Sequence, residues 1–223
     1  MKKAFTLAEV LITLGIIGIV SAITLPTLIT NYQKKKTVSQ LQRAISVLNQ
    51  AYRQSVDDLG DSIDEAYNMG TKEYINTYWG PYLKINQICE KYSDCGYTNN
   101  RPFYEPNGKD KQGSDAFVRN SRIGVKTMDG FTYIFFTSNW TAEGGFSTPT
   151  NWVWVDLNGE AKPNIFGKDV FELRRIDDKG IQPLGYGQSE TYVNNFCTEN
   201  NGATCAEKIR RAGWVIDKSY PWK

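Results

Sequence analysis

The sequence predicts an α+β fold in which a long amino-terminal helix packs on an antiparallel sheet of about four strands. Three observations support this fold class. Residues 10–29 form an apolar run without charge, residues 38–59 carry an apolar stripe with helical spacing, and residues 123–176 contain strand-like segments separated by turns. One helix followed by consecutive strands is typical of an α+β domain.

The apolar run is long enough to cross a membrane as a helix, at about 1.5 Å per residue against about 30 Å of hydrocarbon. Lys2 and Lys3 precede the run, and Glu9 is the one acid in the apolar segment. A carboxylate in such a segment costs roughly 2.5–3.5 kcal/mol on insertion scales. We therefore expect Glu9 to have a specific function.

The segment from Phe5 to Glu9, FTLAE, resembles the leader of type IV prepilins and type II secretion pseudopilins. The resemblance implies that prepilin peptidase cuts between Ala4 and Phe5 and methylates the new amino terminus. Ala4 departs from the glycine that usually precedes the cut in this family. Pro26 matches the position at which pilin helices often carry a proline kink. The resemblance is strong over residues 1–59 and much looser beyond them.

Charge pairing gives Glu9 a role in assembly. Cleavage would create a free α-amino group on Phe5, and opposite charges in low dielectric need partners. In a helical stack of subunits, Glu9 of one chain would meet the amine of the next and fix the axial register. A secretory signal peptide cut after Ala22 and a plain single-span anchor are the alternatives, and neither explains Glu9.

Beyond the apolar run the helix becomes amphipathic. Polar residues such as Gln40 and Asn49 are predicted on its outer face, and Gly60 is predicted to end it. The apolar or small positions recur at steps of three and four and form one stripe, namely Val38, Leu41, Ala44, Ile45, Leu48, Ala51, Tyr52, Val56 and Leu59.

The chain is expected to divide into a leader (1–4), a membrane or filament-core half of the helix (5–29), an amphipathic half (30–60) and a head (61–223) with a loop insertion at about 61–122. Lysines at 34–36 outnumber Lys2 and Lys3, so the extracytoplasmic placement of the head depends on the leader resemblance.

The chain has 26 basic and 24 acidic residues, and loss of Lys2 and Lys3 leaves 24 of each. Bulk charge therefore indicates no nucleic-acid partner.

Four cysteines indicate an oxidising compartment, in agreement with an exported head. Three pairings are open, and local pairing of Cys89 with Cys95 and of Cys197 with Cys205 is favoured because polar, turn-rich segments lie between them. Zinc is the alternative, but the spacing does not fit and the chain has no histidine. The second pair resembles the disulfide-bounded loop near the carboxyl end of many pilins.

The remaining elements of the head follow from turn signals and alternation. Residues 71–88 are predicted to form short helices broken at Gly80 and Pro81, and 96–122 an exposed loop. Asp129-Gly130 predicts a hairpin. The predicted strands are 123–128, 131–137, 152–157 and 170–176, followed by a short helix at 206–212.

A calcium ion is the one cofactor that the sequence suggests. The segment around 155–171 looks like a stretch common in pseudopilin heads, and major pseudopilins bind calcium in this general region. Asp156, Asn158 and Asp169 would supply oxygen ligands. Gly159 falls at the fourth position from Asp156 instead of the sixth that an EF-hand needs, so a simple turn is the favoured interpretation.

Aromatic and basic residues offer a weaker suggestion of ligand binding. Exposed clusters could stack on sugars or bases, although the Trp152-Val153-Trp154 alternation favours a sheet face in the core. Acidic residues lie between the basic residues of the loop at 96–122. This mixture of charges favours an ordinary solvated surface over a DNA-uptake surface. The aromatic candidates are Tyr97, Phe103, Tyr104, Trp152, Trp154 and Trp214, and the basic ones are Arg101, Lys109, Lys111, Arg119 and Arg122.

Without histidine, triads and imidazole bases are excluded, and no enzymatic activity is expected. The sequence predicts a pilin-like or pseudopilin-like subunit of an extracytoplasmic filament. Its expected partners are other subunits, prepilin peptidase, the inner-membrane assembly machinery and membrane lipid. The alternatives are a minor tip subunit or adhesin, a DNA-uptake pilin and a plain membrane-anchored binding protein.

Overall fold

The computed structural model describes residues 6–60, 69–109, 122–136, 152–176 and 179–222. Its contacts divide the chain into two units, Met1–Lys36 and Thr37–Lys223. Helix α1, Leu7–Leu59, contributes to both units. It ends before Gly60, which adopts a left-handed φ of 74° as a helix-terminating glycine does. The long helix and its predicted end are therefore confirmed.

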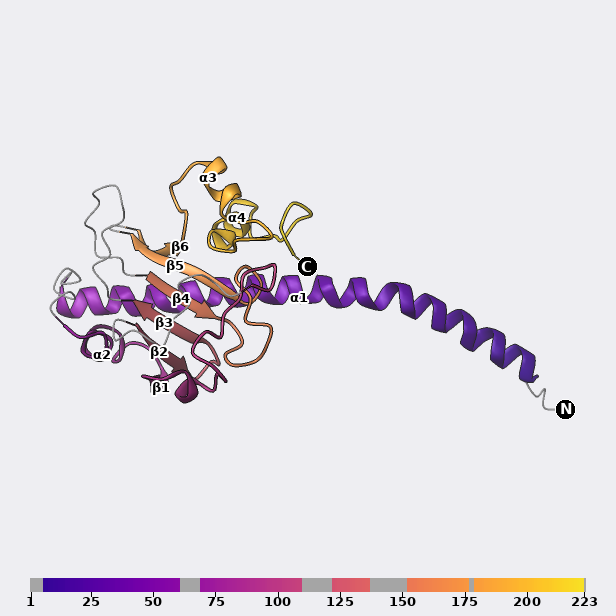
Figure 1. The fold of residues 1–223 in the computed structure, drawn as a ribbon, viewed down its shortest axis with the longest axis horizontal. Helices are drawn as coiled ribbons and strands as arrows, with labels where there is room; N and C mark the ends of the chain where they lie inside the picture. Colours follow the sequence, from indigo (N-terminus) through magenta and orange to yellow (C-terminus); the bar gives the residue numbers. More distant parts are fainter. Residues whose placement is uncertain (1–5, 61–68, 110–121, 137–151, 177–178, 223) are drawn as a thin grey trace. The chain divides into compact units, whose positions relative to one another are not determined.

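The second unit contains a six-stranded antiparallel sheet in which sequence neighbours pair in the order β1-β2-β3-β4-β5-β6 (Figure 1). The four predicted strands are present and two more flank them. The strands are β1 (Ile85–Cys89), β2 (Arg122–Thr127), β3 (Thr132–Phe136), β4 (Trp152–Asp156), β5 (Val170–Ile176) and β6 (Gly180–Pro183).

The helical prediction for residues 71–88 was wrong in its second half. Helix α2 (Thr71–Tyr74) and a π-helical turn (Ile75–Trp79) end at Gly80 as predicted, but β1 follows. A non-local partner decides this, since β1 pairs with β2 across the loop that lies between them in sequence. Tertiary pairing commonly overrides weak local propensity in a strand of five residues.

The sheet is covered on both faces, and alternation along its central strands assigns each side chain to a face. On β4, Val153 and Val155 join the core beneath α1, whereas Trp154 points to a second core on the opposite face. The stripe of α1 fills the first core as predicted, with Val38, Leu41, Ala44, Leu48 and Ala51 all buried. Burial on both faces explains why the central strands are almost continuously apolar.

The second core corrects the prediction of an exposed loop at 96–122. Tyr97 and Phe103 are buried, and Phe103 makes edge contacts with Trp154 and Phe166. Aromatic rings in this edge-to-face arrangement pack favourably in cores. Residues 110–121 of the same segment lie outside the described residues.

Two short helices complete the second unit beside β5 and β6 (Figure 1). Helix α4, Cys205–Arg211, confirms the helix predicted at 206–212. Helix α3, Glu190–Asn195, was not predicted, although Ser189 caps it by accepting a hydrogen bond from the Tyr192 N–H at 3.1 Å. A six-residue helix is too short to show a clear apolar period.

Candidate assembly site and its supporting head

Glu9 lies in the first turn of α1 and is held by Thr6. The Thr6 N–H and hydroxyl both donate to Glu9 Oε2 at 2.8 Å, and the Glu9 N–H donates to Thr6 Oγ1 at 3.3 Å. This reciprocal pairing is a capping box, and the spacing Thr-x-x-Glu is its sequence signal, which the sequence reasoning overlooked. Ala4 and Phe5 lie outside the described residues, so the geometry of the cleavage position is not part of the site.

The apolar side chains that follow Glu9 are not buried by any other part of the described chain. Every large hydrophobic residue from Leu7 to Ile29 is between 42% and 77% exposed. This segment passes the length and hydropathy test for a membrane span, as one helix near the amino terminus. So large an apolar surface requires lipid or other protein around it. α1 continues through Pro26 without a break.

The amphipathic half of α1 is fixed to the head by polar side chains as well as by its stripe. Gln40 Nε2 donates to the Leu157 carbonyl at 3.3 Å. Asn49 bonds both backbone groups of Ile181 in β6, accepting from its N–H at 2.9 Å and donating to its carbonyl at 2.8 Å. Gln40 and Asn49 therefore contact the head, whereas the other polar residues predicted on the face opposite the stripe are exposed, namely Gln42, Arg43, Arg53 and Asp57.

Asn49 also supports β6, which pairs with β5 on its other side. β6 is an edge strand of four residues, and the amide of Asn49 satisfies the backbone of Ile181 in the manner of a neighbouring strand. Gly180 has a left-handed φ of 69° and lies directly against the Asn49 side chain, where a Cβ would collide with it. No pattern within residues 180–183 indicates this contact, because it is made by a residue more than 130 positions away.

The three proposed calcium ligands come together, and the carboxylate oxygens of Asp156 and Asp169 accept hydrogen bonds. Asp156 Oδ2 accepts from the Tyr97 hydroxyl at 2.8 Å and its Oδ1 from the Asn158 N–H at 3.1 Å. Asp169 accepts from the N–H groups of Asn164 and Ile165 at 2.8 and 2.6 Å. Each carboxylate thus closes a turn of the chain.

The amide of Asn158 donates from its nitrogen, and its buried Oδ1 accepts no hydrogen bond within the described chain. Its Nδ2 donates to the Lys162 carbonyl at 3.3 Å and bonds Asp169, so its N–H₂ end, and not its oxygen, faces the acceptors. Among the described residues there is no group of three or more acidic, cysteine or histidine side chains placed to hold a metal. Calcium takes six to eight oxygen ligands, of which these three side chains would supply only a part, so calcium binding here stays a prediction.

Burial raises the pKa of Asp156 well above its usual range, and the neighbouring charge of Asp169 raises it further. Burial also raises the pKa of Asp169, against the effect of its backbone donors. A carboxyl with a raised folded-state pKa keeps its proton after the unfolded chain has lost it. The contribution of these two carboxyl groups to the free energy of unfolding is therefore lost as the pH rises from about 4 through their folded-state pKa values.

The thermal midpoint of the wild-type full chain in detergent is expected to fall between pH 4 and pH 7. We expect Asp156→Asn to make this fall smaller. Asp57→Asn, which makes the same change of charge on an exposed position of α1, is the matched control and should leave the slope as in the wild type. Calcium is expected to leave the midpoint of both proteins unchanged. A calcium-dependent rise that Asp156→Asn removes would show instead that the ion binds here.

The loop of residues 164–170 joins the helix, the sheet and the carboxyl-terminal segment. Thr37 Oγ1 donates to the Lys168 carbonyl at 3.2 Å, and the Tyr220 hydroxyl donates to the Gly167 carbonyl. Gly167 has a φ of 80°, and a Cβ there would lie 3.0 Å from Cys205 Sγ. The segment that resembles pseudopilin heads thus forms a structural junction in this protein.

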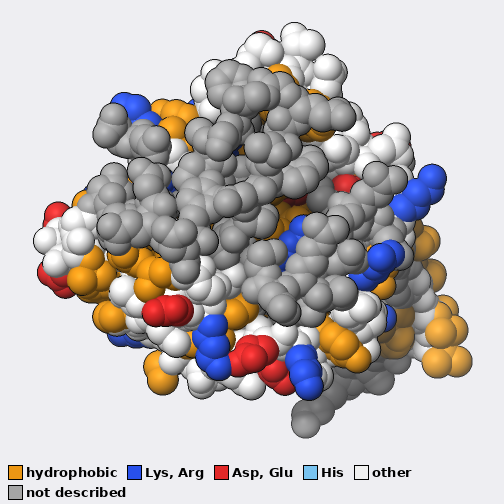
Figure 2. Space-filling model, turned by 60° about the vertical axis from the view of Figure 1, so that its left-hand side comes forward, with side chains coloured by type: hydrophobic (Ala, Val, Ile, Leu, Met, Phe, Trp, Pro, Cys, Tyr) orange, Lys and Arg blue, Asp and Glu red, His pale blue; other side chains and the backbone are white. Residues whose placement is uncertain are grey.

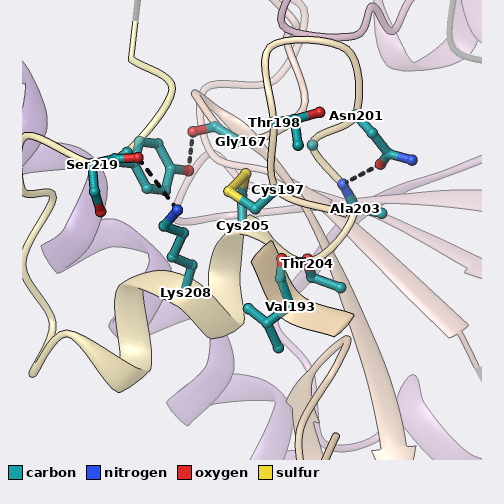
Figure 3. Close-up of a disulfide and its surroundings, with 12 residues drawn as sticks. Gly167, Val193, Cys197, Thr198, Asn201, Ala203, Thr204, Cys205, Lys208 and Ser219 are labelled. Atoms are coloured by element: carbon teal, nitrogen blue, oxygen red, sulfur yellow. Dashed lines mark hydrogen bonds between the residues drawn. A yellow bond between two sulfur atoms is a disulfide. The ribbon is translucent and has the colours of Figure 1, made fainter. Parts of the chain in front are cut away.

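Both disulfides are local, Cys89–Cys95 and Cys197–Cys205, and all four cysteines are buried. Figure 3 shows the second one at the start of α4, beneath a loop whose turn is held by the Ala203 N–H donating to Asn201 Oδ1 at 2.9 Å. The Thr204 hydroxyl donates to the Val193 carbonyl of α3 at 2.7 Å. The disulfide therefore joins α3 and α4 into one packed corner.

Comparison with known proteins identifies the amino-terminal part of the chain. A family model described as the prokaryotic N-terminal methylation motif matches residues 1–25. No curated protein and no solved structure matches the chain. The matched segment includes Glu9, its capping residue Thr6 and most of the exposed apolar surface. The chain therefore begins with the prepilin-type leader of type IV pilins and pseudopilins, followed by an apolar helix and an α+β head.

Proposed function

We propose that this chain is a pilin-like or pseudopilin-like structural subunit of an extracytoplasmic filament, either a type IV pilus or a type II secretion pseudopilus. The observation that carries the proposal is that the methylation motif coincides with the first half of α1, where every large apolar side chain from Leu7 to Ile29 is exposed. A filament core made of such helices would bury that surface against neighbouring subunits. The proteins that carry this leader are structural and not enzymatic.

Each part of the site has a role in this proposal. Prepilin peptidase exposes the amine of Phe5, Glu9 pairs with the amine of the next subunit, and Pro26 allows the helix to bend within the assembly. The inner-membrane assembly machinery and lipid are the remaining partners. Two buried disulfides support an extracytoplasmic head, since disulfides persist in oxidising compartments.

Three of the six aromatic candidates for ligand binding by a minor tip subunit are buried, whereas Tyr104, Trp152 and Trp214 are half-buried. Tyr97, Phe103 and Trp154 are at most 4% exposed and belong to the second core. Arg122 lies over the Phe136 ring at 4.6 Å from its centroid and so belongs to the sheet. Among the described residues on the face in Figure 2, basic and acidic side chains are interspersed.

Intact mass and amino-terminal sequencing of the protein from its native membrane test the proposal. The expected chain begins at Phe5 with a methylated amine. A chain that begins at Ile23 would mean a secretory signal peptide, and a chain that retains Met1 would mean a plain anchor. Either result would overturn the filament proposal. Abundance of the processed chain in purified filaments then separates a bulk subunit from a rare one.

A further inference from the structure

Three consecutive lysines follow the apolar surface of α1. Lys34, Lys35 and Lys36 lie within the first unit, and the side chains of Lys35 and Lys36 are exposed. We call these three residues the lysine collar. Consecutive residues are about 100° apart around a helix, so the three side chains spread over roughly 200° of its circumference. Lys34 is half-buried and interacts within the protein, so Lys35 and Lys36 are the collar residues that face the surroundings.

The sequence of α1 offers the lysine collar no ion pair within the helix. Helical ion pairs need an acid three or four residues away. Between Glu9 and Asp57 the sequence of α1 contains no acidic residue at all. The nearest acid along this helix thus lies about 30 Å from Lys36, at roughly 1.5 Å per residue. Pairing within α1 cannot explain why the charges are grouped here.

The depth of the collar matches the headgroup layer of a membrane. If the uncharged run of residues 10–29 fills the hydrocarbon, Lys34 begins about 7.5 Å beyond its end, at roughly 1.5 Å per residue. The headgroup region is about 5–7 Å thick on each side, and lysine stems extend back toward it. Tyr32, 67% exposed between the run and the collar, is the type of aromatic residue enriched at this interface.

We propose that the lysine collar binds the headgroups of anionic phospholipids on the head side of the membrane. The inference uses the span of the proposed function and adds its lipid partner. Processing before Phe5 would remove Lys2 and Lys3, which leaves the collar as the only lysines that flank the span. The processed subunit is then held at a fixed depth by charge on one side of the membrane alone.

Lipid selectivity of the processed full-length chain tests this proposal. Electron spin resonance of vesicles containing spin-labelled phosphatidylglycerol or phosphatidylcholine measures which lipid is motionally restricted beside the protein. Each lysine near an anionic surface favours that surface by about fivefold. We expect wild-type protein to prefer phosphatidylglycerol by at least about threefold at 50 mM salt, with the preference falling at 500 mM because surface charge is screened.

The triple variant K34Q/K35Q/K36Q is expected to lose most of this preference. The control K84Q/K162Q/K218Q removes the same charge from exposed positions of the head and should keep it. Equal selectivity of wild type and collar variant would overturn the proposal. Intact mass of the same samples reports processing independently, so a chain that retains Met1 would refute the filament function while the collar and control variants still test the lipid contact.

Discussion

Glutamine in place of Glu9 is expected to reduce recovery of the chain in assembled filaments at least tenfold while leaving its processing and folding intact. The substitution keeps an oxygen for Thr6 but removes the negative charge that would pair with the amine of the next subunit. Truncating one partner of a pair in low dielectric leaves the other charge without compensation, which costs about 3–5 kcal/mol. The measurement is the amount of chain in sheared filaments relative to the amount in the membrane.

Thr6→Ala is the matched variant for this experiment. It removes the hydroxyl that caps the helix but keeps the Glu9 charge, and cap loss costs only about 1 kcal/mol. We expect T6A to assemble far better than E9Q. If E9Q filaments form at the wild-type level, Glu9 does not set the register and the span must be recognised through its apolar surface alone.

Alanine in place of Asn49 is expected to destabilise the head by about 2–3 kcal/mol. The Ile181 N–H and carbonyl would both lose their side-chain partner, and each unsatisfied group at a partly buried position costs about 1–3 kcal/mol. For a protein of this size the thermal midpoint should fall by roughly 4–12 °C. Differential scanning calorimetry of the full chain in detergent measures this fall in the thermal midpoint.

Gln50→Ala provides the control on the neighbouring position. Gln50 is exposed and bonds only Ser46 within the same helix, so its loss should stay within about 0.5 kcal/mol. Asn49→Asp tests the direction of the bonds, since it keeps the acceptor for the Ile181 N–H and places a second oxygen against the carbonyl. Wild-type stability of N49D would refute the bidentate role.

Local signals in the sequence were sufficient for the helix and the central strands. Gly60 and the Asp129-Gly130 turn each act through their own backbone, so their effects could be predicted without knowledge of distant contacts. The leader was equally local, because the Phe5 to Glu9 segment is a short motif, and the methylation motif at residues 1–25 includes it.

What sequence reasoning missed depends on residues far apart in the chain. Strands β1 and β6 are edge strands of four or five residues, and each forms because of its contacts with β2, β5 or Asn49. Tyr97 was treated as a loop residue because its neighbours are polar, yet it is buried and donates to Asp156. Turn-like composition does not reveal that a loop folds back over a sheet.

The contacts between α1 and the rest of the head also determine the order in which the protein can fold. Asn49 and Ile181 are 132 residues apart, and Thr37 and Lys168 are 131. At about 5–20 residues per second, ribosomes need roughly 7–26 s to supply the second partner after the first. During that interval the sheet that covers the apolar stripe of the helix is incomplete. The nascent chain is then most open to aggregation and proteolysis.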